Sequence, residues 1–176
     1  MLHASDVAAE LRAHLGSSLG RAKLHKLLYL CQAWHATWTH KPLFVESIEA
    51  WEKGPVVATL WRAEQHGFPP AARPDPLDPE AGATVEYVVS RYGHHTGQSL
   101  IGLTHGPGPW RDAYDRGQNT RIEVTAMIEH FAQDQAADQA WFWDPEWQAG
   151  EREADQDIRH GRVTRYESAD DFIASL

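Results

Sequence analysis

The sequence predicts a mainly α (α+β) protein: a compact helical domain with a small β element near residues 43–51, then a C-terminal helix-strand-helix extension. Three observations support this prediction. Apolar residues recur at helical spacing through residues 19–40. An extended stretch and a Gly-Pro pair follow directly. Residues 134–176 hold few bulky apolar side chains, so they are expected to form an appendage rather than a second core.

Length and composition are those of a globular protein. The chain has 176 residues, of which 42% are hydrophobic and 23% are charged, enough for one domain and an appendage. No apolar run approaches the roughly 18 residues of a membrane span, and the N-terminal residues lack a signal-peptide pattern. The single cysteine, Cys31, excludes an internal disulfide and is expected to be a buried thiol. Together these features predict a cytoplasmic protein without membrane contact.

The negative charge is concentrated at the C-terminus. The formal net charge is −9, with a net of −7 in residues 134–176 and −2 in residues 1–133. An acidic surface does not neutralise phosphates, so nonspecific nucleic-acid binding is not predicted. A negative segment suits a basic protein partner instead.

The first half of the chain predicts helices around one extended segment. Ser5 is expected to cap a first helix, and the helix over residues 19–40 is expected to end before Pro42. Residues 43–51 are predicted to be extended. Pro55 is then expected in the first turn of a helix that ends near Gly67. The core-facing stripe of the long helix consists of Leu24, Leu27, Leu28, Cys31, Trp34, His35 and Trp38.

The second half is punctuated by proline and glycine. Five prolines within residues 68–82 predict an exposed loop. Residues 84–92 fit a helix, with a strand left open by their β-branched content. Thr96 is expected to cap a short helix. A Gly/Pro-rich turn is expected to position Trp110, and a further helix is expected over residues 122–134.

The C-terminal segment predicts three short elements. Asp144-Pro145 is a typical helix start, and His160-Gly161 a typical stop. Arg162–Tyr166 fits one strand. Ser168 and Asp171 form a capping box before a final helix. We therefore predict a domain at residues 1–133 and an acidic extension at residues 134–176.

Two stretches resemble the Panacea (SocA-like) domain family. They are KLHKLLYLCQAWHATWTHKPLFVESIEAWEKGPVVATLWR, at residues 23–62, and YGHHTGQSLIGLTHGPGPWRDAYDRG, at residues 92–117. The family pattern is K-L-x-K-L-L-Y, K-P-L-F, I-E-A-W-x-x-G-P-V and then T-H…P-W, and the resemblance spans roughly residues 2–131. It implies an antitoxin that binds and neutralises a cognate protein toxin encoded beside it. It also implies an alternative function, because at least one such domain is a proteolytic adaptor that presents a client to a protease.

The tail is similar to the toxin-wrapping C-terminal segments of many small type II antitoxins. The pattern in EREADQDIRHGRVTRYESADDFIASL is an acidic helix, a short strand with an aromatic residue, and a capped end with a terminal leucine. Short elements that cannot form a core alone typically fold on a partner. The toxin is expected to be basic. The predicted partner-binding residues are Trp147, Ile158, Arg162, Val163, Tyr166, Phe172, Ile173 and Leu176, with a possible second contact at Trp51, Glu52 and Lys53.

Other functions find little support in the residues. The eleven histidines form no H-E-x-x-H arrangement and a second cysteine is lacking, so neither a metal nor a cofactor is predicted. A phosphate loop, a nucleophile elbow and paired carboxylates are also lacking, so the chain is not expected to be an enzyme. The basic stretch Arg21–Lys26 is expected to be a solvated helix face rather than a DNA contact. The tryptophans at residues 34, 38, 51, 61 and 110 are expected in the core rather than in a ligand cage.

Overall fold

The computed structural model describes residues 2–17, 19–66 and 76–139. Backbone contacts divide the chain into two units, Met1–Asp134 and Gln135–Leu176, and the fold described here is that of the first. The described residues form, in order, α1 (Ala4–Leu15), α2 (Arg21–Thr39), β1 (Glu49–Trp51), β2 (Gly54–Val56), α3 (Ala58–Gln65), α4 (Pro79–Tyr92), α5 (Gly97–Thr104), α6 (Pro109–Arg116), β3 (Thr120–Arg121) and α7 (Val124–Gln139). The predicted mainly helical fold with a small β element is confirmed, and the predicted C-terminal helix-strand-helix extension lies outside the described residues.

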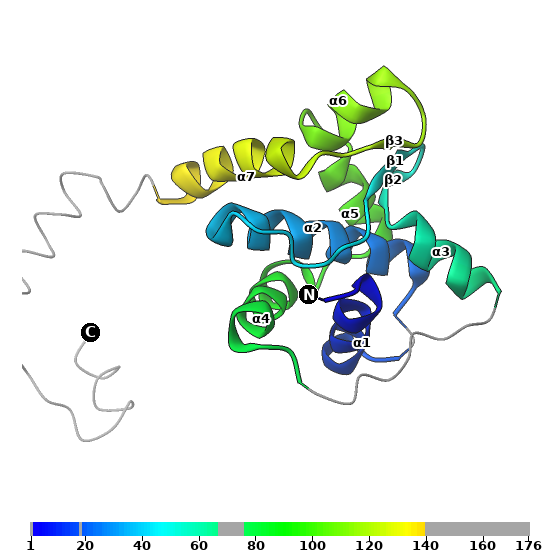
Figure 1. The fold of residues 1–176 in the computed structure, drawn as a ribbon, viewed down its shortest axis with the longest axis vertical. Helices are drawn as coiled ribbons and strands as arrows, with labels where there is room; N and C mark the ends of the chain where they lie inside the picture. Colours follow the sequence, from blue (N-terminus) through cyan, green and yellow to red (C-terminus); the bar gives the residue numbers. More distant parts are fainter. Residues whose placement is uncertain (1, 18, 67–75, 140–176) are drawn as a thin grey trace, which may run out of the picture. The chain divides into compact units, whose positions relative to one another are not determined.

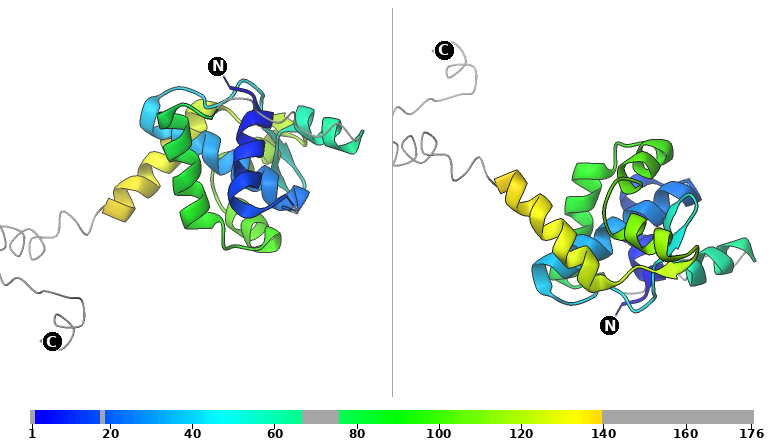
Figure 2. Two further views of the ribbon diagram at one scale, coloured as in Figure 1. Left: turned by 90° about the horizontal axis from the view of Figure 1, so that it is seen from below. Right: turned by 90° about the horizontal axis from the view of Figure 1, so that it is seen from above.

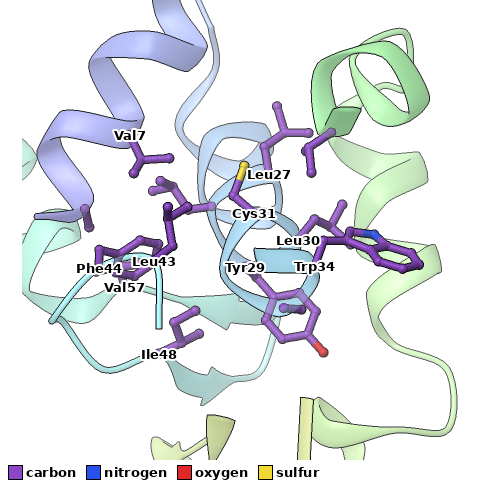
Figure 3. Packing of buried hydrophobic residues seen from close by; sticks show 14 of the residues in the cluster. Val7, Leu27, Tyr29, Leu30, Cys31, Trp34, Leu43, Phe44, Ile48 and Val57 are labelled. Atoms are coloured by element: carbon purple, nitrogen blue, oxygen red, sulfur yellow. The ribbon is translucent and has the colours of Figure 1, made fainter. Parts of the chain in front are cut away.

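Helix α2 lies at the centre of this unit (Figure 1, Figure 2). Every residue from Leu24 to Thr37 is buried, because α1, α4, α5 and β2 all pack against the helix. A helix surrounded in this way needs apolar side chains on all sides rather than on one stripe. Figure 3 shows the apolar side chains of α2 leaving the helix in different directions toward Val7, Phe44 and Ile48. The predicted buried thiol is confirmed, since Cys31 is unpaired and buried, and burial raises its pKa.

Aromatic side chains close one end of the core. Trp34 is 2% exposed and donates a hydrogen bond through Nε1 to the hydroxyl of Tyr92 at 3.2 Å. Phe131 of α7 meets the Trp34 ring edge-on, at 5.2 Å between ring centroids. Trp38 stacks on the same ring at 5.5 Å but is 38% exposed. The prediction that the tryptophans lie in the core is therefore confirmed for Trp34 and wrong for Trp38.

A small antiparallel sheet, in the order β2-β1-β3, crosses one end of α2. In the β1–β2 hairpin Glu49 pairs with Val56, Ala50 with Pro55 and Trp51 with Gly54. Pro55 therefore lies in a strand, and its predicted place in the first helical turn is wrong. An edge strand tolerates proline, because its missing N–H can face away from the ladder. The helix begins only at Ala58, after β2 has ended.

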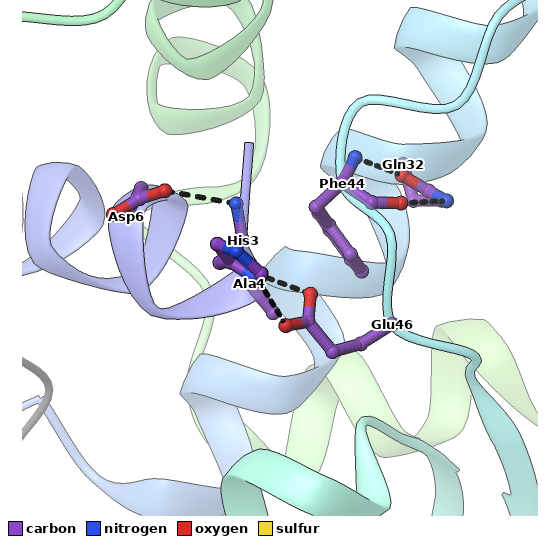
Figure 4. Close-up of polar contacts among 6 residues, drawn as sticks. All are labelled: His3, Ala4, Asp6, Gln32, Phe44 and Glu46. Atoms are coloured by element: carbon purple, nitrogen blue, oxygen red, sulfur yellow. Dashed lines mark hydrogen bonds and ion pairs between the residues drawn. The ribbon is translucent and has the colours of Figure 1, made fainter. Parts of the chain in front are cut away.

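Two polar side chains hold the irregular segment between α2 and β1 (Figure 4). Gln32 accepts hydrogen bonds from the amides of Leu43 and Phe44, at 2.9 and 3.1 Å, and donates one to the carbonyl of Phe44 at 3.3 Å. Glu46 accepts from the amide of Ala4 at 2.7 Å. These side chains supply the partners that a strand ladder would otherwise provide. Within the predicted extended stretch 43–51, regular strand structure is confined to β1.

Several helix starts differ from the sequence-based expectations. Helix α1 begins at Ala4, because His3 caps it and the Asp6 carboxylate accepts from the His3 amide at 2.8 Å; the predicted cap at Ser5 is wrong. Helix α4 begins inside the expected proline loop, where Asp78 caps it and Pro79 occupies its first turn. The predicted Thr96 cap of α5 is confirmed by a 3.1 Å hydrogen bond from the Ser99 amide. The helix expected over residues 84–92 is therefore confirmed, but it begins earlier, at Pro79, inside the stretch that its prolines had marked as a loop.

The Gly/Pro-rich turn leads into a further helix that the sequence pattern had not indicated. Pro109 starts α6, and Trp110 is 2% exposed within it. The expected core position of Trp110 is therefore confirmed.

The helices of the described residues are all too short or too polar to span a membrane.

Candidate functional site

The tip of the β1–β2 hairpin carries the predicted second contact. Trp51 pairs with Gly54 across the hairpin, so Glu52 and Lys53 form the turn, where both are exposed. Gly54 has a φ of +99°, a conformation that glycine adopts without strain. The structure therefore brings Trp51, Glu52 and Lys53 together on one protruding turn. The eight predicted partner-binding residues of the tail, from Trp147 to Leu176, lie outside the described residues.

A buried lysine lies directly beneath this turn. Lys26 of α2 is 2% exposed, and its Nζ donates a hydrogen bond to the Pro55 carbonyl at 3.1 Å. The contact is close enough that a Cβ on Gly54 would lie 2.5 Å from Lys26 Cε. Burial lowers the pKa of Lys26 to about 8, because the charged ammonium has lost water. Glycine at position 54 is thus required twice, by its φ and by the lysine below it.

Two tryptophans enclose a pocket between the turn and α2. Trp51 and Trp61 meet at 5.7 Å between ring centroids, and the Trp51 indole donates to Glu49 at 2.9 Å. The pocket measures about 290 Å³. Its lining consists of apolar walls, two basic side chains of α2 and the turn itself: Ala22, His25, Lys26, Trp51, Glu52, Lys53, Val56, Trp61 and Ile101. Trp51 and Trp61 are half-buried, so their predicted full burial in the core is wrong.

The turn is braced from its other side by Trp110. The Trp110 indole donates a hydrogen bond to the Trp51 carbonyl at 3.0 Å. His105 stacks flat on Trp110, with ring centroids 4.0 Å apart and planes inclined by 5°. Arg111 lies over the same indole at 4.8 Å. The T-H…P-W motif noted in the sequence therefore supports the Trp51–Lys53 turn.

A buried carboxylate and a neutral histidine lie next to the pocket. The Glu64 side chain, 8% exposed, pairs with Arg12 and lies 3.6 Å from Nε of Arg21. His25 Nδ1 accepts from the Val57 amide at 3.3 Å, so its proton is on Nε2, which lies 3.8 Å from Glu64. Burial, and then the nearby Lys26, Arg21 and Arg12, lower the pKa of His25 to about 3. His25 is therefore neutral at physiological pH.

The stretch Arg21–Lys26 was expected to be a solvated face, and this is wrong for three of its basic side chains. His25 and Lys26 are buried, and Lys23 is half-buried and donates to the Gly93 carbonyl at 2.6 Å. Among the basic side chains of this stretch, only that of Arg21 is exposed, and its guanidinium lies over the Trp61 ring at 5.1 Å. The signal that could have indicated burial is the apolar composition on every side of the helix that follows.

The described residues offer no metal centre, since no three His, Cys, Asp or Glu side chains among them come together as ligands. The arrangement instead combines a rigid turn, aromatic walls and a buried cation. Such features are typical of a binding surface, where tryptophan and positive charge contribute most of the affinity.

Comparison with known proteins identifies the family. The family model described as "Antitoxin SocA-like, Panacea domain" matches residues 24–111, which is half of the chain. The matched range begins in α2 and ends in α6, so it includes the hairpin, Trp110 and every residue that lines the pocket except Ala22. No curated protein and no solved structure matches the chain. The chain belongs to the SocA-like antitoxin family and carries its Panacea domain.

Proposed function

We propose that this protein neutralises a cognate protein toxin by binding it directly. Family membership implies a role in a toxin–antitoxin system, a toxin as partner and a non-enzymatic function. The proposed mechanism uses two surfaces: the acidic segment 134–176, and the Trp51–Lys53 turn with the pocket behind it. The toxin is basic and is encoded in the adjacent reading frame.

The observation that carries the proposal is the geometry of the turn within the matched family range. Glu52 and Lys53 are exposed at the tip, while Trp51 is held from behind by hydrogen bonds to Glu49 and from Trp110. A preorganised tryptophan beside a pocket loses little conformational entropy on binding. Residues of this kind are typical anchors of protein–protein interfaces.

The acidic segment contributes the second surface through charge. Its net charge of −7 suits a basic toxin, because complementary potentials accelerate association and suppress wrong partners. Its apolar residues are spaced along the segment and provide anchors: Trp147, Ile158, Val163, Tyr166, Phe172, Ile173 and Leu176. Arg162 and Tyr166 bound the strand expected to extend a sheet of the toxin.

Truncation tests the role of the acidic segment. A chain that ends after Gln139 keeps α7 whole and removes residues 140–176. When it is expressed with the toxin, we expect a soluble protein that no longer protects cells and no longer co-purifies with the toxin. Full protection by this truncated chain would refute the assignment of the tail.

Substitutions at the turn test the second surface in the full-length chain. Trp51→Ala combined with Lys53→Glu is expected to weaken toxin binding about tenfold or more, because both an anchor and a charge are changed. The matched control is Trp38→Ala with Lys41→Glu, which changes the same residue types at exposed positions outside the turn. Equal binding by the two double variants would argue against the turn.

An activity assay on the purified complex distinguishes an adaptor from a protein that neutralises the toxin directly. A protein that blocks the toxin inhibits its activity without any protease. An adaptor leaves the toxin active until a protease is added. We expect inhibition by the purified chain alone, in proportion to the complex formed.

A further inference from the structure

We propose that the pocket behind the Trp51–Lys53 turn binds a carboxylate carried on an apolar group, with the Lys26 ammonium as its charge partner. The pocket adjoins the turn that is proposed to contact the toxin, but its carboxylate ligand is inferred from the lining residues alone and is tested without the toxin. The carboxylate can come from a free organic acid or from the C-terminus of a polypeptide, and both present the same chemistry.

The first observation is a buried charge with too few hydrogen-bond partners. An ammonium has three donor hydrogens, and among the described residues Lys26 Nζ has one hydrogen-bond acceptor, the Pro55 carbonyl. Lys26 forms no ion pair with a carboxylate of the described residues, and desolvation is the cause of its lowered pKa. Buried lysines are ordinarily paired, because an isolated charge away from water is unfavourable. An incoming carboxylate would provide the missing partner.

The second observation is the shape and composition of the pocket that Lys26 lines. Its volume of about 290 Å³ lies near the lower end of the range for ligand sites, about 300–1,000 Å³. Trp51, Val56, Trp61 and Ile101 give it apolar walls. These walls would cover the apolar part of a ligand while Lys26 receives its negative end. One amino-acid side chain with its carboxylate matches this size and polarity.

The pocket composition also argues against a phosphate. Phosphate sites typically use arginine forks or backbone amides at a helix N-terminus. Here the positive groups are Lys26 and the rim residue Lys53, opposed by Glu52 at the same rim, and the remaining lining is largely apolar. A carboxylate with one negative charge, attached to an apolar group, therefore fits one buried cation and apolar walls better than a phosphate does.

The test uses the full-length chain and two matched pairs of probes. The first pair is N-acetyl-leucine and its uncharged amide. The second is a ten-residue peptide ending in leucine, with either a free or an amidated C-terminus. We expect each acid to bind about 10- to 100-fold more tightly than its amide at pH 7, as measured by calorimetry and by the change in tryptophan fluorescence. If the two acids bind equally well, a free organic acid is sufficient as the ligand. If the peptide acid binds more tightly, the ligand is the C-terminus of a polypeptide. Both results support the site.

Variants connect binding to the pocket. Lys26→Met is expected to reduce acid binding to the level of the amide. Lys41→Met, which removes an exposed lysine outside the pocket, is expected to bind as the unchanged chain does. Because Lys26→Met also removes the support of the Pro55 carbonyl, Ala22→Phe provides a second variant. Ala22 is an exposed residue at the pocket wall, and phenylalanine there fills the pocket without changing Lys26.

A pH profile gives a readout that a purely structural lysine would not produce. Lys26 has a pKa of about 8 without ligand, so acid binding is expected to be constant from pH 6 to 7 and to fall more than about tenfold by pH 9.5. The titratable and charged groups that line the pocket with Lys26 are His25, Glu52 and Lys53. Glu64, Arg12 and Arg21 surround His25, and Arg111 lies near His105, which is itself close to Lys26. Burial lowers the pKa of both histidines below its usual value, so the loss of acid binding above pH 7 does not come from either ring. Lys53→Met is expected to keep the profile, which separates the two lysines.

Three results would overturn the proposal. They are binding of neither acid at millimolar concentration, equal binding of acid and amide, and unchanged acid binding by folded Lys26→Met or Ala22→Phe. An affinity that stays constant from pH 7 to 9.5 would likewise exclude Lys26 as the charge partner.

Discussion

Buried polar residues around the Gly54-Pro55 dipeptide are the most informative single residues in this protein. His25 and Lys26 are neighbours on α2, and each holds a backbone group of the strand end above it. His25 accepts from the amide of Val57, while Lys26 donates to the carbonyl of Pro55. Their charges differ, because His25 is neutral and Lys26 remains protonated at pH 7. The K-L-x-K motif of α2 and the G-P-V motif of β2 are therefore in direct contact, through the hydrogen bond from Lys26 to Pro55.

At the residue scale, the burial of His25 predicts that the folded protein loses stability in acid. Its pKa is about 3 in the folded protein and 6.5 without burial, so the unfolded chain takes up a proton first as the pH falls. This contribution to stability is fully present above pH 6.5 and is lost as the pH falls toward 3. Between pH 7 and 5 the unfolding free energy is expected to fall by about 2 kcal/mol from this residue.

The measurement is urea unfolding of the unchanged chain and of His25→Asn at both pH values. Asparagine can still accept from the Val57 amide but does not titrate, so the acid-dependent loss should shrink by about 2 kcal/mol. His94→Gln, a change at an exposed histidine, is the control and should keep the full loss. Identical pH dependence in His25→Asn and the unchanged chain would contradict the assignment.

At the scale of elements, the β1–β2 hairpin depends on Gly54, whereas the interior of α4 does not depend on Gly82. Gly54 combines a φ of +99° with a side chain 2.5 Å from the position of an added Cβ. Gly82 lies inside α4, where an added Cβ meets nothing within 4 Å. The two glycines therefore provide a matched pair for testing the hairpin.

We expect Gly54→Ala to destabilise the protein by about 2 kcal/mol or more, through backbone strain and displacement of Lys26. Gly82→Ala should stabilise it by about 0.5–1 kcal/mol, since alanine is the better helix former. Thermal unfolding of both variants measures the contrast. A neutral Gly54→Ala would mean that the turn relaxes easily and does not preorganise Trp51.

At the scale of the whole unit, burial of α2 makes the single cysteine a reporter of global opening. Cys31 lies at 0% exposure among side chains of α2, α1 and the segment before β1. Burial also raises the pKa of its thiol. In the folded state a reagent therefore cannot reach the sulfur, and the thiol stays protonated and unreactive.

We expect a disulfide reagent to modify native Cys31 more than about a thousandfold more slowly than the urea-unfolded chain. The free energy calculated from this ratio should agree with the free energy of global unfolding. Cys31→Ala, which has no thiol, gives the background of the reagent. A much faster reaction would show that α2 becomes exposed by local opening.

Local sequence signals predicted the elements where local physics decides the conformation. The spacing of Leu24, Leu27, Leu28 and Cys31 predicted α2, and Thr96 predicted the start of α5, because caps and periodicity act within one or two turns. Trp51, Glu52 and Lys53 were named from the sequence as a possible second contact, but Trp51 was also expected in the core, and the structure shows it half-buried. The local signal was misleading at Pro55 and Pro79, since proline suits both an edge strand and a first helical turn.

The sequence alone determined that this is a mainly helical protein with a small sheet, and its motifs placed it in the SocA-like antitoxin family. Only the tertiary structure showed that Lys26 and His25 are buried and that Trp51 and Trp61 enclose a pocket with them. The physical reason is that burial of a polar side chain depends on what packs around it. The partners of α2 come from α1, the hairpin, α4 and α5, at separations along the chain that no local pattern encodes. Because of these tertiary contacts, a stretch that reads as basic and exposed in the sequence places a buried, charged Lys26 beneath the Trp51–Lys53 turn.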